Sequence, residues 1–152
     1  MRLHLSRGRD GHTLIELLTV LAVIAIVVST AAPSMKGYME RNRARGALDR
    51  IASDIAYARV LAVRSGSRIV LEFHGSSYDL TEEGVTPRML RTVSLAQEYP
   101  GVTIVPPTAD SRLEFNSRGM LRTAPTGSLI ARTGSSSDSA SITMAGRVYR
   151  AY

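Results

Sequence analysis

The stretch Gly11-His12-Thr13-Leu14-Ile15-Glu16 opens an apolar run that continues to Ala32 and stops at Pro33. No charged residue occurs between positions 17 and 28. A helix of about 20 residues is about 30 Å long, which is the thickness of the hydrocarbon core of a bilayer. The sequence therefore predicts a helix that can span a membrane. It carries a carboxylate, Glu16, just inside its start, and an ionisable group in such a segment is a functional-site hypothesis by default.

A short polar leader that contains Arg2, Arg7 and Arg9 precedes Gly11. This N-terminal region resembles the signal of type IV pilins and type II secretion pseudopilins. The resemblance lies in the polar leader, the glycine, the residues Thr13-Leu14-Ile15-Glu16 and the uninterrupted apolar run, all of which occur together. The resemblance implies that a prepilin peptidase cuts between Gly11 and His12 and that the new N-terminus, His12, is methylated. His12 departs from the pattern, because the family usually has phenylalanine at this position.

Two ordinary readings of the same stretch compete with this one. A secretory signal has an apolar segment of about 7–15 residues before a small-residue cleavage site, and Ser29-Thr30-Ala31 has the composition of such a site. The length of the run and Glu16 argue against it. A plain single-pass anchor is the other reading. Basic residues flank both ends of the run, so charge bias does not orient it. A single-pass position in the bacterial inner membrane, with the C-terminal domain in the periplasm, is what the resemblance implies.

Beyond Pro33, where we expect a kink in the helix, apolar residues recur at helical spacing. They are Leu48, Ile51, Ala52, Ile55, Ala58 and Ala62, and charged residues, Asp54 among them, are assigned to positions off this stripe. Ser65-Gly66 predicts the end of the helix, because glycine can adopt the left-handed cap conformation.

After Gly66 the pattern changes to short segments rich in β-branched, aliphatic and aromatic residues, separated by turn residues. The predicted strands are 68–73, 78–80, 89–93, 102–105, 112–115, 128–132, 142–144 and 148–149. Residues 133–140, mostly glycine and serine, predict a mobile low-complexity loop. The fold class is therefore α+β, with a long N-terminal helix packed on a C-terminal antiparallel β domain.

Three further segments resemble the GspH/FimT group of minor pilins. They are Asp54-Ile55-Ala56-Tyr57-Ala58-Arg59, Phe115-Asn116-Ser117-Arg118-Gly119 and Ile142-Thr143-Met144-Ala145-Gly146-Arg147-Val148.

 We expect the chain to consist of a leader (1–11), a transmembrane and filament-core helix (12–33), an amphipathic half-helix (34–65) and a β-rich globular domain (66–152).

Composition limits the chemistry that the chain can perform. It has no cysteine, and its three histidines lie in the leader, at the expected cut and in a predicted turn. The sequence contains no nucleophile motif, no phosphate-binding loop and no metal-ligand cluster. We therefore expect a protein that is not an enzyme, with no cofactor and no metal site.

The function that remains for such a chain is assembly with other proteins, and the resemblance indicates which assembly. It implies a minor pilin or pseudopilin of a type II secretion pseudopilus or a type IV pilus, and it does not separate these two machines. The implied partners are other pilin subunits, the prepilin peptidase and the inner-membrane assembly platform. The Glu16 carboxylate would pair with the N-terminal amine of a neighbour, whereas a carboxylate hydrated near the headgroups is the alternative.

Binding of DNA in DNA uptake is the alternative function. The net charge is +6, and minor pilins that resemble FimT have a Gly-Arg-x-Arg pattern near the C-terminus. Here the stretch reads Gly146-Arg147-Val148-Tyr149-Arg150, with the second arginine one residue late. Arg147 and Arg150 are the candidate DNA contacts, and a merely solvated basic surface is the simpler reading.

Overall fold

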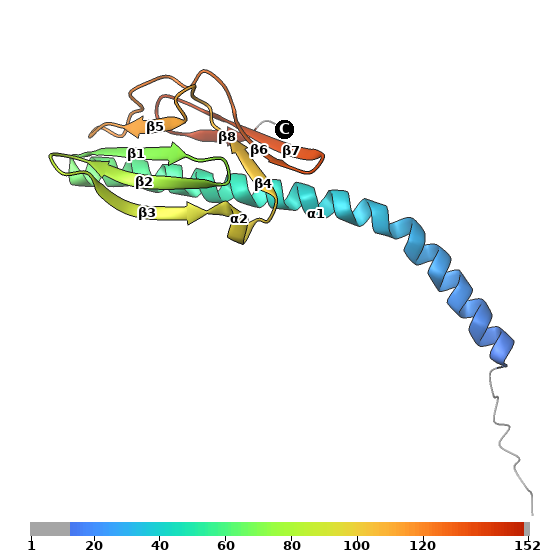
Figure 1. Cartoon of the computed structure of the whole chain (residues 1–152). Helices are drawn as coiled ribbons and strands as arrows, with labels where there is room; N and C mark the ends of the chain where they lie inside the picture. The colour runs from blue at the N-terminus through green and yellow to red at the C-terminus, as the bar shows by residue number, and fades with distance from the viewer. Residues whose placement is uncertain (1–12, 151–152) are drawn as a thin grey trace, which may run out of the picture. The chain divides into compact units, whose positions relative to one another are not determined.

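The computed structural model describes residues 13–150, apart from the side chains of residues 30–34. It divides into two compact units, one that ends at Lys36 and one, the body, that begins at Gly37. Helix α1 (Leu14–Ser65) contributes to both units (Figure 1). The backbone stays helical at Pro33, and the predicted kink there is not tested. The helix ends at Ser65 as predicted, and Gly66 follows it with a φ of 66°.

The body contains two four-stranded antiparallel sheets beside α1. The first has the strand order β3-β2-β1-β5 and the second β4-β6-β7-β8. A short helix, α2 (Leu95–Glu98), follows β3. The strands are β1 (Arg68–Phe73), β2 (Ser77–Glu83), β3 (Arg88–Ser94), β4 (Val102–Val105), β5 (Arg112–Phe115), β6 (Leu129–Thr133), β7 (Ser136–Ile142) and β8 (Val148–Arg150). The α+β fold class is confirmed.

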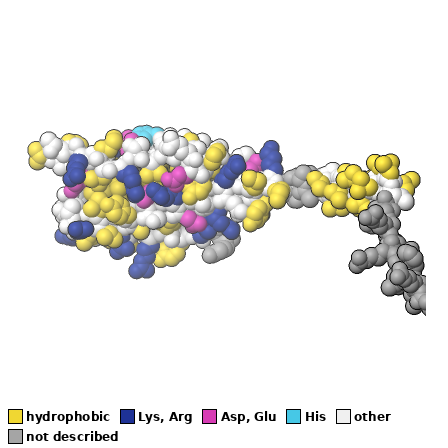
Figure 2. Space-filling view, turned by 90° about the horizontal axis from the view of Figure 1, so that it is seen from below, with side chains coloured by type: hydrophobic (Ala, Val, Ile, Leu, Met, Phe, Trp, Pro, Cys, Tyr) yellow, Lys and Arg dark blue, Asp and Glu magenta, His cyan; other side chains and the backbone are white. Residues whose placement is uncertain are grey.

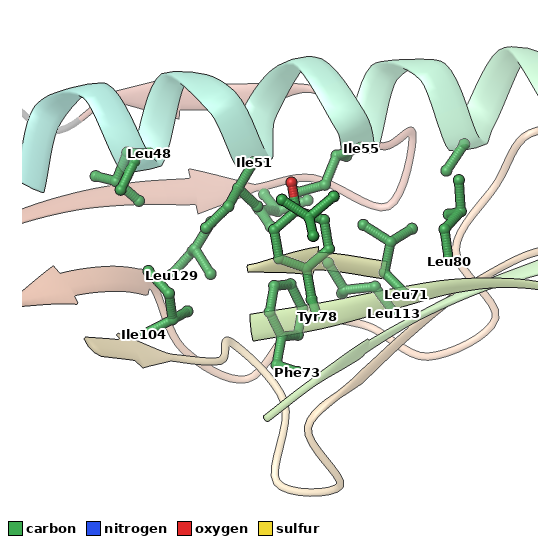
Figure 3. Close-up of a cluster of buried hydrophobic side chains, with 14 of the residues drawn as sticks. Leu48, Ile51, Ile55, Leu71, Phe73, Tyr78, Leu80, Ile104, Leu113 and Leu129 are labelled. Atoms are coloured by element: carbon green, nitrogen blue, oxygen red, sulfur yellow. The ribbon is translucent and has the colours of Figure 1, made fainter. Parts of the chain in front are cut away.

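One face of α1 and the inner faces of both sheets form the core of the body. Leu48, Ile51 and Ile55 extend from the helix toward side chains of both sheets, including Leu71 and Leu129 (Figure 3). All five are at most 2% exposed. Burial of each large aliphatic side chain stabilises a fold by about 1.5–3 kcal/mol. This face of the helix therefore holds the two sheets together.

The predicted mobile loop over residues 133–140 is wrong. Thr133 pairs with Ser136 across a tight turn, and β7 continues to Ile142 in register with β6 and β8. The hydrogen bonds between strands join backbone groups, so serine and glycine residues do not prevent them. Ala140 and Ile142 are also buried at alternate positions, as in a strand with one face on the core. The predicted strand 142–144 is also wrong, because β7 ends at Ile142 and the residues after it form a turn in which the Gly146 N–H donates to the Thr143 carbonyl at 2.8 Å.

Asp54 is buried, contrary to its assignment off the apolar stripe, with 5% of its surface exposed. It accepts hydrogen bonds from the Tyr78 hydroxyl and from the Arg91 guanidinium, and Nε of Arg50 lies 3.3 Å from its carboxylate. Burial and the hydrogen bond to Asp54 raise the pKa of Tyr78. The burial of Asp54 could have been predicted from its spacing. It follows Ile51 by three residues and precedes Ala58 by four, which places all three on one face of the helix.

Candidate assembly surface

The apolar side chains at the start of α1 are exposed. Eleven large apolar residues from Leu14 to Val28 each have between 51% and 79% of their surface accessible. Figure 2 shows hydrophobic side chains gathered on this stretch of the helix. Contiguous apolar surface of this extent marks a site of interaction with protein or lipid.

Glu16 lies in the first turn of α1, and Thr13 precedes the helix as its cap. The Glu16 N–H donates to the Thr13 carbonyl at 3.0 Å and approaches the Thr13 hydroxyl at 3.3 Å. Threonine followed three residues later by glutamate is the pattern of a capping box, and a carboxylate at this end complements the helix dipole. The Glu16 side chain is exposed. Gly11 and His12, the residues of the expected cut, lie outside the described residues.

The hydroxyl groups within the apolar run bond to the helix itself. Thr19 Oγ1 donates to the Ile15 carbonyl at 2.7 Å, and Ser29 Oγ donates to the Ile26 carbonyl at 2.8 Å. Such bonds satisfy polar side chains without water. Across the part of the chain that the structure describes, no helix is both long enough and apolar enough to cross a membrane. The transmembrane segment over residues 12–33 is therefore not confirmed and stays a prediction.

The body carries a groove between the outer face of α1 and the segment before and within β8. Its volume is about 520 Å³, and its walls are Ala52, Ala56 and Val60 on the helix and residues 146–149 opposite. Val60 is 64% exposed and Tyr149 is 52% exposed. Two basic residues, Arg59 and Arg147, also line it. The groove is thus apolar with basic side chains at its margin.

Two turns hold Arg59 in this place. A Cβ added at Gly119 would lie 3.1 Å from Cγ of Arg59, and one added at Gly146 would lie 3.5 Å from its Cδ and 2.5 Å from the Phe115 ring. Both glycines also have positive φ, 72° and 68°. The three segments whose resemblance to minor pilins the sequence shows, 54–59, 115–119 and 142–148, therefore converge on Arg59. Sequence reasoning did not single out Arg59, although its place in one of these segments was a signal.

The two candidate DNA contacts have different surroundings. Arg147 is exposed, and it is one of the residues that line the groove. Arg150 pairs with Asp49, lies 3.6 Å from the Asp138 carboxylate and donates to the Arg45 carbonyl at 3.3 Å. In the folded body the Arg150 guanidinium is held by the carboxylates of Asp49 and Asp138. The structure therefore does not bring Arg147 and Arg150 into one site.

Among the described residues there is no group of three or more histidine, cysteine, aspartate or glutamate side chains that could hold a metal ion. His74 lies 3.2 Å from the Asp79 carboxylate at the turn between β1 and β2. That the chain is not an enzyme stays a prediction.

An N-terminal helix with an exposed apolar start, packed farther along on antiparallel sheets, defines a type IV pilin-like subunit. The chain matches the family model of the type II transport protein GspH over residues 47–146 and the prokaryotic N-terminal methylation motif over residues 6–32. It therefore belongs to the GspH family, which makes it a minor pilin or pseudopilin of a type IV pilus or a type II secretion system.

A solved structure has the same fold. The crystal structure of the type IV minor pilin FimU of Pseudomonas aeruginosa strain PAO1 matches with a TM-score of 0.60 over 76% of this chain and 92% of that chain. Its sequence is 19% identical, so this likeness concerns the fold alone. No curated protein matches the sequence.

Proposed function

We propose that the protein is a structural subunit of a type II secretion pseudopilus or a type IV pilus and that it assembles through the start of α1. The observation that carries this proposal is the exposed apolar stretch from Leu14 to Val28 with a single carboxylate, Glu16. In water this surface is unstable. A bilayer covers it before assembly, and the helices of neighbouring subunits cover it in the filament.

Glu16 gives the assembly its selectivity in this proposal. After the prepilin peptidase cuts behind Gly11, the new methylated N-terminus at His12 carries a positive charge. An unpaired carboxylate in an apolar environment costs several kcal/mol. Docking that places the Glu16 carboxylate beside the N-terminal amine of a neighbour is therefore favoured over docking that leaves it unpaired. The subunit waits in the inner membrane, with its body in the periplasm, until the assembly platform extracts it.

Processing is tested by mass spectrometry of the protein after coexpression with a prepilin peptidase. The expected mass is that of a chain that starts at methylated His12. An intact leader, or a chain that starts at Ala32, would contradict the proposal.

Assembly is tested by substitution of Glu16. Glu16→Ala is expected to enter membranes at least as well as the wild type and to be several-fold depleted from sheared filaments, because its docking no longer gains a charge pair. Glu82→Ala, which removes a carboxylate from β2 of the body, is the matched control and is expected to assemble normally. Equal recovery of Glu16→Ala and the wild type in filaments would show that the carboxylate has no part in assembly. The genes that neighbour the coding sequence distinguish the two machines, since secretion operons and pilus operons contain different companions.

The alternative function is binding of duplex DNA by the body. Arg147 supports it, because this side chain is exposed and shares the groove with Arg59. The internal ion pairs of Arg150 count against the two-arginine form of the hypothesis.

A further inference from the structure

We propose that the groove between α1 and β8 receives the apolar start of α1 from a second copy of the chain, with Glu16 of that copy beside Arg59 and Arg147. This inference rests on the proposed function and names the surface that receives the helix. It assigns a second cationic partner to Glu16 in addition to the amine of a neighbour, since a carboxylate accepts several hydrogen bonds at once.

The shape of the groove suits a helix. Ala52 and Ala56 are one helical turn apart and lie at the wall of the groove. Small residues at this spacing let a second helix backbone approach closely. Val60 and Tyr149 extend the apolar surface and are more than half exposed, and an exposed tyrosine with a largely apolar ring is a favourable contact residue.

The charges of the two surfaces are complementary. Among the described residues, neither Arg59 nor Arg147 forms an ion pair with a carboxylate, although six other arginines of the body do. The apolar stretch from Leu14 to Ser29 contains a single ionisable side chain, and it is a carboxylate. An apolar helix with one negative charge therefore matches an apolar groove with two positive charges.

A phosphate backbone fits the groove less well. Proteins that follow a nucleic-acid backbone do so with positively charged surface, whereas the walls here are alanine, valine and the tyrosine ring. The Arg59 residue is also half-buried, and its methylene stem lies against two turns, so this side chain is positioned for one docked group rather than for a sliding chain.

The absence of cysteine allows a direct test by disulfide trapping. Two differently tagged full-length copies, one with Ala56→Cys and one with Leu17→Cys, are coexpressed with the assembly machinery, and the membranes and filaments are oxidised. The proposal expects a mixed disulfide dimer. Val85→Cys is the matched control for Ala56→Cys, because Val85 is fully exposed in the turn between β2 and β3, and it is expected to give no mixed dimer.

Charge reversal tests the role of the arginines. Arg147→Glu in the Ala56→Cys copy is expected to lower the yield of mixed dimer by about fivefold, the effect of losing one exposed charge pair. Arg132→Glu, at an exposed position on β6, is expected to leave the yield unchanged.

The outcomes separate this inference from the proposed function. Disulfides between two Leu17→Cys copies without any between Leu17→Cys and Ala56→Cys would mean that the helices assemble and that the groove is not their docking site. Equal yields of mixed dimer from the Ala56→Cys and Val85→Cys copies would also overturn the inference. Loss of the mixed dimer on addition of duplex DNA would overturn it too, because it would assign the groove to nucleic acid. Absence of the protein from sheared filaments would contradict the proposed function itself.

Discussion

The two units of the chain use apolar residues in opposite ways. In the N-terminal unit the large apolar side chains from Leu14 to Val28 are more than half exposed, whereas in the body Ile51, Ile55 and Phe115 are fully buried. The body therefore has a core of its own, and the N-terminal stretch has apolar surface without one. The apolar residues of the body therefore stabilise its fold, whereas those of the first unit form the surface through which we propose that the chain assembles.

The largest expected effect contrasts one residue from each unit. Phe115→Ala is expected to destabilise the body by about 3–5 kcal/mol, because it removes a fully buried ring and leaves a cavity. Leu21→Ala, in the exposed stretch, is expected to leave the stability of the body unchanged. Urea unfolding of the full chain in mild detergent, followed by tyrosine fluorescence, measures this difference. All six tyrosines lie at Tyr38 or later, so the signal reports the body. An equal loss of stability in both variants would break the comparison.

A smaller effect is expected where the body buries a charge. Asp54→Asn is expected to cost about 2–3 kcal/mol, since Arg50 and Arg91 lose their carboxylate but remain partly hydrated, with 35% and 39% of their side chains exposed. Asp49→Asn is the matched control. Its side chain is 66% exposed in the pair with Arg150, and its loss is expected to cost less than about 1 kcal/mol. The same urea titration compares them, and equal costs would mean that burial of Asp54 has no energetic weight.

Asp54 also shows where prediction from sequence stops. The long helix, its end at Ser65, the strand pattern and the N-terminal signal follow from local spacing and composition, and the structure or the family match confirms them. The helical spacing of Asp54 indicates the buried face, but its residue type led to an exposed assignment. Its partners Tyr78 and Arg91, which make burial possible, lie on strands that only the tertiary fold brings to α1. The serine-rich β7 was missed for the same reason, since its order comes from pairing with β6. The groove at Arg59 requires three distant segments to meet.

Alkaline pH is expected to weaken the body through Tyr78. Burial and the hydrogen bond to Asp54 raise the pKa of the Tyr78 hydroxyl above its ordinary value. The stabilisation is complete below the unfolded pKa of about 10, and it declines as the pH rises from there toward the folded pKa, because only the unfolded chain has released the proton. The expected slope is about 1.4 kcal/mol per pH unit. Tyr78→Phe should abolish this component and Tyr149→Phe, at an exposed position, should retain it. Identical slopes in both variants would assign the alkaline transition to other groups.

The smallest expected effect concerns the binding of duplex DNA by the body. If the body binds duplex DNA through phosphate contacts, the logarithm of its affinity falls with the logarithm of the salt concentration by about 0.9 for each contact. Arg147→Gln should then flatten the slope by about 0.9, because Arg147 is exposed and forms no ion pair with any carboxylate of residues 13–150. Arg150→Gln should change it less, because Asp49 and Asp138 already hold that guanidinium. Electrophoretic shifts at two salt concentrations measure both slopes. Equal flattening would mean that Arg150 leaves its carboxylates to bind DNA, and no shift of the wild type at low salt would leave assembly through the N-terminal helix as the function of the chain.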